Sequence, residues 1–269
     1  MTSPSLSQLA TPFTAQPAIP LPLEAAFAGD IARGTKGRRA RLVQEWLTLQ
    51  GVKVQIDDDF GGVTETAVRA FQTARGLPPN GIVDRATFDA LVAPMVAAMQ
   101  TITPPPNATF GQMTVLYARQ HLAQHPQEVG GPNMGPWVRL YMDGEQGAPQ
   151  AWCAGFATYM QRLASATLHQ PVPVKRSVGC DDLARAAQRD PSGTRFSHGC
   201  PDIARITPGS LFLLRKTDTD WHHTGIVTGA EAEGFHTIEG NTNDQGSRDG
   251  FEVCARVRHY DLMDFIVVA

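Results

Sequence analysis

The sequence has few of the features that define several large classes of protein. Only four cysteines occur in 269 residues: Cys153, Cys180, Cys200 and Cys254. None forms a Cys-x-x-Cys pair, and no Cys/His cluster has zinc-finger spacing, so neither a disulfide framework nor a structural zinc site is expected. A single bridge between Cys180 and Cys200 stays open. We therefore predict no metal and no cofactor.

Long apolar runs and strong net charge are also absent. No stretch of about 18 apolar residues occurs, so we expect no membrane-spanning helix and no stable membrane insertion. The net charge is -3, which argues against nucleic acid as a partner. Residues 1–29 contain five prolines and lack the basic and apolar regions of a secretory signal peptide. We expect the protein to be made in the cytoplasm without a signal peptide.

Composition divides the chain into four parts. Residues 1–30 are rich in Ser, Thr, Pro and Ala and predict a flexible leader. Residues 31–99 have a helical pattern, and three consecutive prolines within 100–110 indicate a semi-rigid linker. Residues 111–269 are expected to form a second domain.

Residues 31–99 predict a small three-helix module. Leu42, Trp46 and Leu49 recur at helical spacing, and Thr64 and Thr87 are suitable N-caps for two further helices. The order and spacing resemble the peptidoglycan-binding module of many cell-wall hydrolases; the residues that carry the resemblance are Gly34, Gly37, Leu42, Asp59, Phe60, Gly61, Thr64, Ala67, Val68, Phe71, Gln72, Gly76, Leu77, Asn80, Gly81, Ile82, Val83, Asp84 and Thr87. Most of them are structural, so they support the fold more than the ligand. A helical module that binds another ligand is the alternative.

The second domain predicts helices first and strands afterwards. Helical patterns cover residues 113–122, 137–141 and 152–163. After a polar stretch, five short strands are expected at 210–215, 224–228, 235–239, 251–257 and 264–268. This layout is typical of an α+β fold in which N-terminal helices pack on an antiparallel sheet.

Cys153 lies at the predicted start of a helix, where unpaired N–H groups stabilise a thiolate. Alone, such a cysteine is more often a core thiol. His223, at the start of a predicted strand, supplies a candidate base, and Gly225 leaves room for the approach of the helix or the substrate. Glu239 and Asn241 are two residues apart and face the same side of the next strand, so either could orient His223.

The order of these groups resembles the papain-like CHAP family of peptidoglycan amidases and endopeptidases, within the wider group of NlpC/P60 enzymes, over residues 112–269. The resemblance implies that Cys153 is the nucleophile, His223 the general base and Glu239 the orienting acid, with Asn241 assisting. It also suggests that residues 131–138 and Tyr141 line the substrate groove.

Three details stay open at this stage. Residues 170–208 look like an insertion over the groove. Within them, His198 and Cys200 form a weaker rival pair, because they lie in a loop. The oxyanion donor is either the Cys153 backbone N–H or Gln150.

The sequence thus predicts a peptidoglycan hydrolase that cleaves an amide of the stem peptide or of its link to the glycan. Its expected place of action is the periplasm or cell wall, reached as a phage-type endolysin or as an antibacterial effector. An effector would also imply a secretion machine and a cognate immunity protein as partners. Two alternatives stay open: a wall-binding protein whose papain-like domain is inactive, and a transferase on the same fold.

Overall fold

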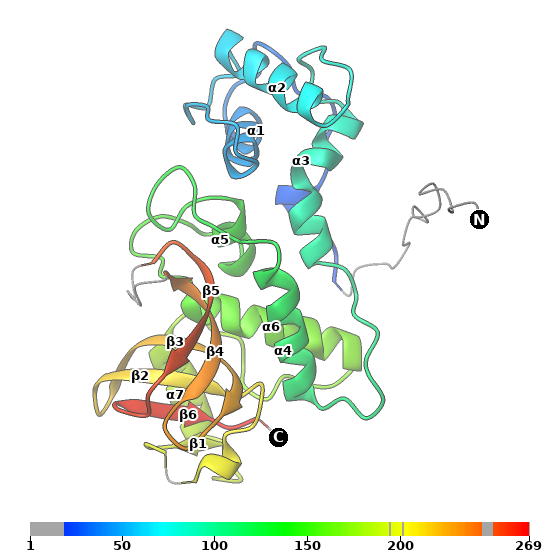
Figure 1. Ribbon diagram of the computed structural model, residues 1–269. Helices are drawn as coiled ribbons and strands as arrows, with labels where there is room; N and C mark the ends of the chain where they lie inside the picture. The colour runs from blue at the N-terminus through cyan, green and yellow to red at the C-terminus, as the bar shows by residue number, and fades with distance from the viewer. Residues whose placement is uncertain (1–18, 194, 201, 244–249, 269) are drawn as a thin grey trace, which may run out of the picture.

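The computed structural model describes residues 19–193, 195–200, 202–243 and 250–268. Helices of the N-terminal part lie at one end of the molecule and a β-sheet lies at the other (Figure 1). In the described part of the chain, no helix combines the length and the apolar character needed to cross a membrane.

The N-terminal part contains a short 3-10 helix, η1 (Leu23–Ala25), and three α-helices: α1 (Arg38–Leu49), α2 (Gly62–Ala74) and α3 (Arg85–Ala98). The predicted caps are wrong, since Gly61 and Asp84 occupy the N-cap positions. Thr64 and Thr87 instead accept hydrogen bonds from two buried glutamines, Gln44 and Gln72, at 3.1 and 3.0 Å. A buried amide must be hydrogen-bonded, and this need determines where the threonines lie.

The C-terminal part places helices on one antiparallel sheet, as the α+β prediction requires. The helices are α4 (Phe110–Leu122), α5 (Pro136–Tyr141), α6 (Cys153–Leu168), α7 (Cys180–Gln188) and the 3-10 helix η2 (Ile203–Arg205). The strands are β1 (Phe196–Ser197), β2 (Leu211–Thr217), β3 (Asp220–Ala230), β4 (Phe235–Thr242), β5 (Glu252–Arg258) and β6 (Met263–Ile266). They form a six-stranded sheet in the order β1-β6-β2-β3-β4-β5.

Strand β3 is the centre of this arrangement. It contacts α4, α6 and α7, while α6 also contacts β4. Strand β3 is also longer than the predicted 224–228, because hairpin pairing with β2 extends it back to Asp220. Strand β1 was not predicted, because two residues are too few for an alternating pattern.

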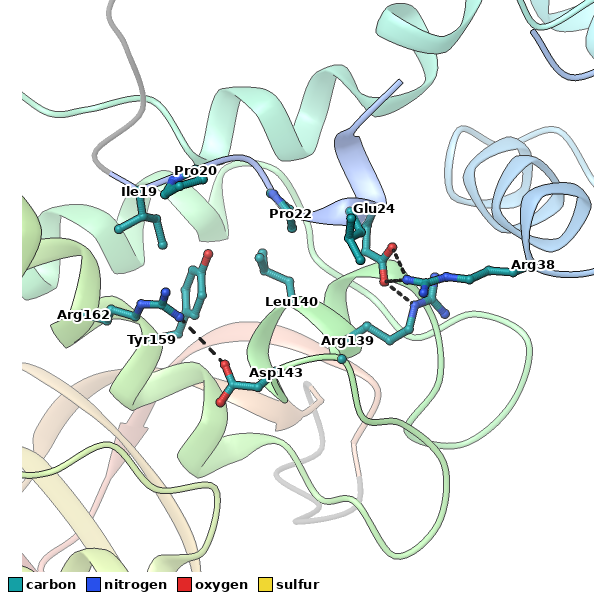
Figure 2. Close-up of a pocket in the computed structure, with 12 residues that line it drawn as sticks. Ile19, Pro20, Pro22, Glu24, Arg38, Arg139, Leu140, Asp143, Tyr159 and Arg162 are labelled. Carbon is teal, nitrogen blue, oxygen red and sulfur yellow. Dashed lines mark hydrogen bonds and ion pairs between the residues drawn. The ribbon is translucent and has the colours of Figure 1, made fainter. Parts of the chain in front are cut away.

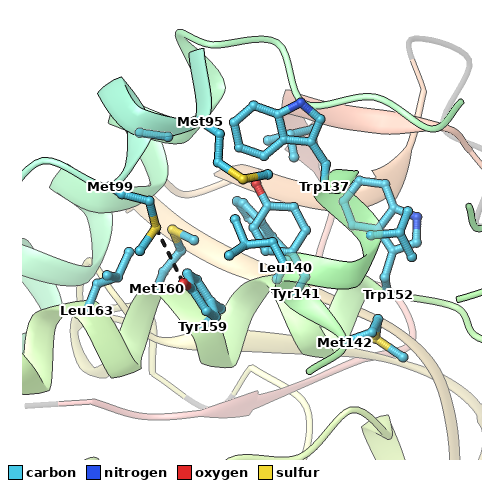
Figure 3. Close-up of a cluster of buried hydrophobic side chains, with 14 of the residues drawn as sticks. Met95, Met99, Trp137, Leu140, Tyr141, Met142, Trp152, Tyr159, Met160 and Leu163 are labelled. Atoms are coloured by element: carbon cyan, nitrogen blue, oxygen red, sulfur yellow. Dashed lines mark hydrogen bonds between the residues drawn. The ribbon is translucent and has the colours of Figure 1, made fainter. Parts of the chain in front are cut away.

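The two parts of the chain share one hydrophobic core. Met95 of α3 and Met99, the residue after this helix, lie against aromatic side chains of α5 and α6 (Figure 3). The indole of Trp46 in α1 meets that of Trp137 edge-on, with ring centroids 6.1 Å apart. Trp137 and Tyr141 are buried in the same cluster, so these two side chains form core and do not line a groove as predicted. Residues 131–134 are exposed or half-buried, and for them the prediction stays open. The two parts are therefore docked directly on each other.

A buried ion-pair network reinforces this docking. Arg139 of α5 donates to Glu24 of η1 at 2.6 Å (Figure 2). It also donates to Glu45 of α1 at 2.6 Å, and all three side chains are at most 7% exposed. Arg38 completes the network from its exposed edge. The predicted flexible leader therefore joins the fold from residue 19 onward, while residues 1–18 lie outside the described residues.

A cavity of about 250 Å³ lies beside this network, between residues 19–24 and helices α5 and α6 (Figure 2). Its lining includes Arg38, Arg139, Tyr159 and Arg162. None of the site residues predicted from the sequence lines this cavity.

Candidate active site

Cys153 is the first residue of α6, where the sequence places it. The preceding Trp152 anchors this end of the helix: its indole N–H donates to Glu128 at 2.8 Å, and its ring stacks on Tyr141 with centroids 5.5 Å apart. Trp152 is the N-cap and provides no side-chain cap, so the first N–H groups of α6 have no capping side chain. Cys153 is 3% exposed.

His223 lies inside β3, as its fourth residue, and not at the start of a strand as predicted. It is paired with Leu214 of β2, and its ring lies 5.8 Å from that of Phe212. Because both neighbouring strands restrain β3, the imidazole is held on a rigid element. His223 is 1% exposed.

The structure brings Glu239 of β4 to His223. The imidazole Nε2 and a Glu239 carboxylate oxygen are 2.8 Å apart, and Glu239 is fully buried. Gly225 makes this contact possible, since a Cβ atom there would lie 2.6 Å from the Cγ of Glu239. The space at Gly225 is thus filled by the Glu239 side chain and by Phe212, and not by a helix or substrate as predicted.

Two further residues hold the Glu239 carboxylate, and sequence reasoning missed both. Arg258, at the end of β5, donates to it through Nε at 2.8 Å and through a second guanidinium nitrogen. The hydroxyl of Thr237 donates to it at 2.6 Å. No local signal identifies Arg258, because its role depends on the pairing of β4 with β5. Thr237 is detectable by strand alternation, two residues before Glu239.

Asn241 is buried near the end of β4 in the left-handed region, with φ of 56°. The pairing of β4 with β5 shifts register between Glu239 and Thr242, so the simple alternation assumed for Glu239 and Asn241 is interrupted. Of the two candidates, Glu239 makes the contact to His223 Nε2. The assisting role of Asn241 stays a prediction.

The buried charges shift one another's pKa values. Burial raises the pKa of Glu239, but hydrogen bonds from Arg258 and His223 outweigh it and bring the pKa to about 2. Burial lowers the pKa of His223, but its interactions with Cys153 and Glu239 outweigh this effect and raise the pKa to about 9. Because Glu239 is then ionised and accepts from Nε2, the nitrogen left for Cys153 is Nδ1, which is buried.

The pKa of Cys153 is well below its usual value. The largest cause is a hydrogen bond from Cys180, and the next favourable one is the interaction with His223, while burial opposes both. The lowered pKa of Cys153 and the raised pKa of His223 both favour a thiolate–imidazolium pair. A thiolate is the nucleophilic form of cysteine.

Sequence reasoning also missed Cys180, the first residue of α7, as a neighbour of this thiol. Its sulfur lies 3.8 Å from that of Cys153, and all four cysteines are free thiols. The bridge between Cys180 and Cys200 is therefore not formed. Helix α7 belongs to the predicted insertion 170–208, which covers the Cys153 sulfur through Cys180. The available signal was a second cysteine at a helix start, before acidic residues.

The rival pair does not form a comparable site. His198 is exposed and contacts Arg215 at 2.9 Å and Asp264 at 3.3 Å. Cys200 is half-buried and packs beside the smaller hydrophobic cluster around Phe212 and Phe265. Within the described ranges, no group of three or more His, Cys, Asp or Glu side chains is placed to hold a metal ion.

Comparison with known families identifies the N-terminal part. The family model for a peptidoglycan binding domain matches residues 36–91. The chain carries a peptidoglycan binding domain. The match spans α1, α2 and the first half of α3, and it ends well before Cys153. No curated protein matches the chain.

Proposed function

We propose that the chain is a peptidoglycan hydrolase of papain-like fold, in which Cys153 and His223 cleave an amide bond. The observation that carries the proposal is the ordered series of Cys153 at a helix start, His223 and the buried Glu239, in a chain with a peptidoglycan binding domain. Burying charged groups costs free energy, so a structural core gains nothing from a thiolate, an imidazolium and a carboxylate buried together. Such clusters are typical of functional sites.

The first half of the reaction transfers the acyl group to the enzyme. The Cys153 thiolate attacks the amide carbonyl carbon, an S–C bond forms, and the carbonyl electrons move to oxygen. The backbone N–H of Cys153, at the start of α6, is the donor that we propose for this oxyanion. The C–N bond then breaks, and His223 gives its Nδ1 proton to the leaving amine.

The second half releases the product. A water molecule gives a proton to Nδ1 of His223 while its oxygen attacks the thioester carbon. Collapse of this intermediate expels the Cys153 thiolate and leaves a carboxylic acid. Glu239 acts through His223: it holds the ring by Nε2 and stabilises the imidazolium, while Arg258 keeps the carboxylate ionised and in place.

The peptidoglycan binding domain gives the proposal its substrate. Because residues 36–91 belong to a part docked on α5 through Arg139, wall binding would hold the catalytic part near the polymer. The proposal places the action of the protein at the cell wall, where a phage-type endolysin or a delivered antibacterial effector would meet it.

The test is digestion of purified peptidoglycan by wild type, Cys153→Ala and the matched control Cys200→Ser. We expect wild type and Cys200→Ser to release soluble fragments, and Cys153→Ala to release none while it still sediments with the wall. Mass spectrometry of the new amine and carboxyl ends then distinguishes an amidase from an endopeptidase. Equal inertness of all three, with wall binding retained, would refute hydrolysis and leave a binding protein. Products joined to an added amine would indicate a transferase.

A further inference from the structure

Cys180 forms and breaks no bond in the acyl-transfer steps, but it lies against the nucleophile, and its hydrogen bond helps to lower the pKa of Cys153. The two sulfurs are 3.8 Å apart, and each cysteine is the first residue of its helix. Cys180 comes from a stretch 27 positions further along the chain. Its position is therefore a product of the tertiary structure and not of neighbouring sequence.

Polar contacts hold Cys180 in place from both sides. Before α7, Arg176 donates to the backbone carbonyls of Tyr141 and Gly155, at 2.7 and 3.1 Å. Directly after Cys180, the carboxylate of Asp181 accepts from the backbone N–H of Trp221 in β3, at 2.9 Å. The segment is thereby tied to α5, to α6 and to β3, the elements around the Cys153 thiol. These hydrogen bonds hold the sulfurs of Cys153 and Cys180 close together.

We propose that Cys153 and Cys180 are a reversible modification site, at which peroxide closes a disulfide that blocks the nucleophile. The formation of the disulfide does not depend on the proposed hydrolase activity; only its inhibitory effect rests on that function. The bond requires the sulfurs to approach from 3.8 Å to about 2.05 Å.

The chemistry uses one peroxide molecule. The Cys153 thiolate attacks one oxygen of hydrogen peroxide, the O–O bond breaks, and hydroxide leaves and is protonated to water. This leaves a sulfenic acid on Cys153. The Cys180 sulfur then attacks the Cys153 sulfur, the S–O bond breaks, and the departing hydroxide takes the thiol proton as a second water. Two thiols are oxidised and one peroxide is reduced to two waters.

The structure also selects this pair over the other cysteines. Cys200 packs beside the cluster of Phe212 and Phe265, and Cys254 lies in β5 opposite Glu239. The sulfur of Cys180, by contrast, lies 3.8 Å from that of Cys153. Without a neighbouring thiol, a sulfenic acid is oxidised further to irreversible sulfinic acid, so Cys180 would protect the nucleophile as well as block it.

The test exposes full-length wild type, Cys180→Ser and Cys200→Ser to hydrogen peroxide, followed by alkylation of remaining thiols and peptide mapping. We expect a peptide cross-linked between Cys153 and Cys180 in wild type and in Cys200→Ser. Wall digestion by these two should be lost and then restored by a reductant. In Cys180→Ser, Cys153 should be recovered as sulfinic acid, and reductant should not restore its activity.

Absence of the cross-linked peptide in oxidised wild type, or equal recovery of wild type and Cys180→Ser, would overturn the proposal. Peptide mapping needs no enzymatic activity. A cross-link in a protein that digests no wall would therefore uphold the disulfide and refute only the hydrolase function. Active enzyme without a cross-link would do the reverse.

Discussion

Gly225→Ala tests whether the contact between His223 and Glu239 controls the site. A Cβ atom at position 225 would lie 2.6 Å from the Cγ of Glu239 and 2.8 Å from a ring carbon of Phe212, where ordinary contacts begin at 3.4 Å. Glu239 must therefore retreat by about 0.8 Å, which would stretch its 2.8 Å contact with His223 beyond hydrogen-bond length. Displacements of this size in a catalytic group cost about 10²-fold in rate.

The matched control is Gly229→Ala in the same strand, because a Cβ atom there has no neighbour within 4 Å. The assay is the rate of fragment release from peptidoglycan, together with the rate of Cys153 alkylation at neutral pH. Overpacking at position 225 should also lower the free energy of unfolding by about 1–3 kcal/mol, so both variants are compared well below their melting temperatures. Equal rates for the two variants would refute the role given to the His223–Glu239 contact.

Three further predictions follow from the buried charges. Arg139→Met should lower the free energy of unfolding by about 3–5 kcal/mol in a urea melt, because Glu45 loses its buried ion-pair partner and Glu24 keeps only the exposed Arg38. Arg38→Met, at a side chain 61% exposed, should cost less than about 1 kcal/mol, and equal costs would contradict this account. Glu239→Gln should lower the free energy of unfolding most above pH 4.5, and the difference from wild type should shrink as the pH falls toward about 2. The reason is that the lowered pKa of Glu239 stabilises the fold only while the carboxylate is ionised. A difference that does not change with pH would contradict a buried, ionised carboxylate. At neutral pH, iodoacetamide should label Cys153 before Cys200, because the pKa of Cys153 is lowered while burial raises that of Cys200. Peptide mapping would measure the order of labelling, and the opposite order would contradict the lowered pKa of Cys153.

The N-terminal domain shows how far local patterns reach. Its three helices follow from apolar spacing, and its family resemblance follows from glycines and apolar residues at set intervals. The caps were mispredicted because Thr64 and Thr87 are hydrogen-bonded to Gln44 and Gln72, which are distant in sequence. Cap propensity describes only the residues at one helix end. A buried side-chain amide requires a hydrogen-bond partner, and here that partner comes from another helix.

The candidate site also combines residues that could be predicted from the sequence with residues that could not. Cys153 could be placed at a helix start because that position depends on a few neighbouring residues. Glu239 and Asn241 could not be separated, because alternation gives both the same face and only the bulge in β4 distinguishes them. Arg258 was out of reach, because strand pairing brings it to Glu239 from 19 positions away.

The helical module, the α+β layout and the order of a cysteine, a histidine and an acid could all be predicted from local patterns in the sequence. Periodicity and helix-end chemistry operate over a few residues, so they can be read along the chain. The folded chain was needed to show that Glu239 contacts His223, that Cys180 lies against Cys153, and that Arg139 joins the two parts. These contacts join distant segments, and the shared packing of the core selects them.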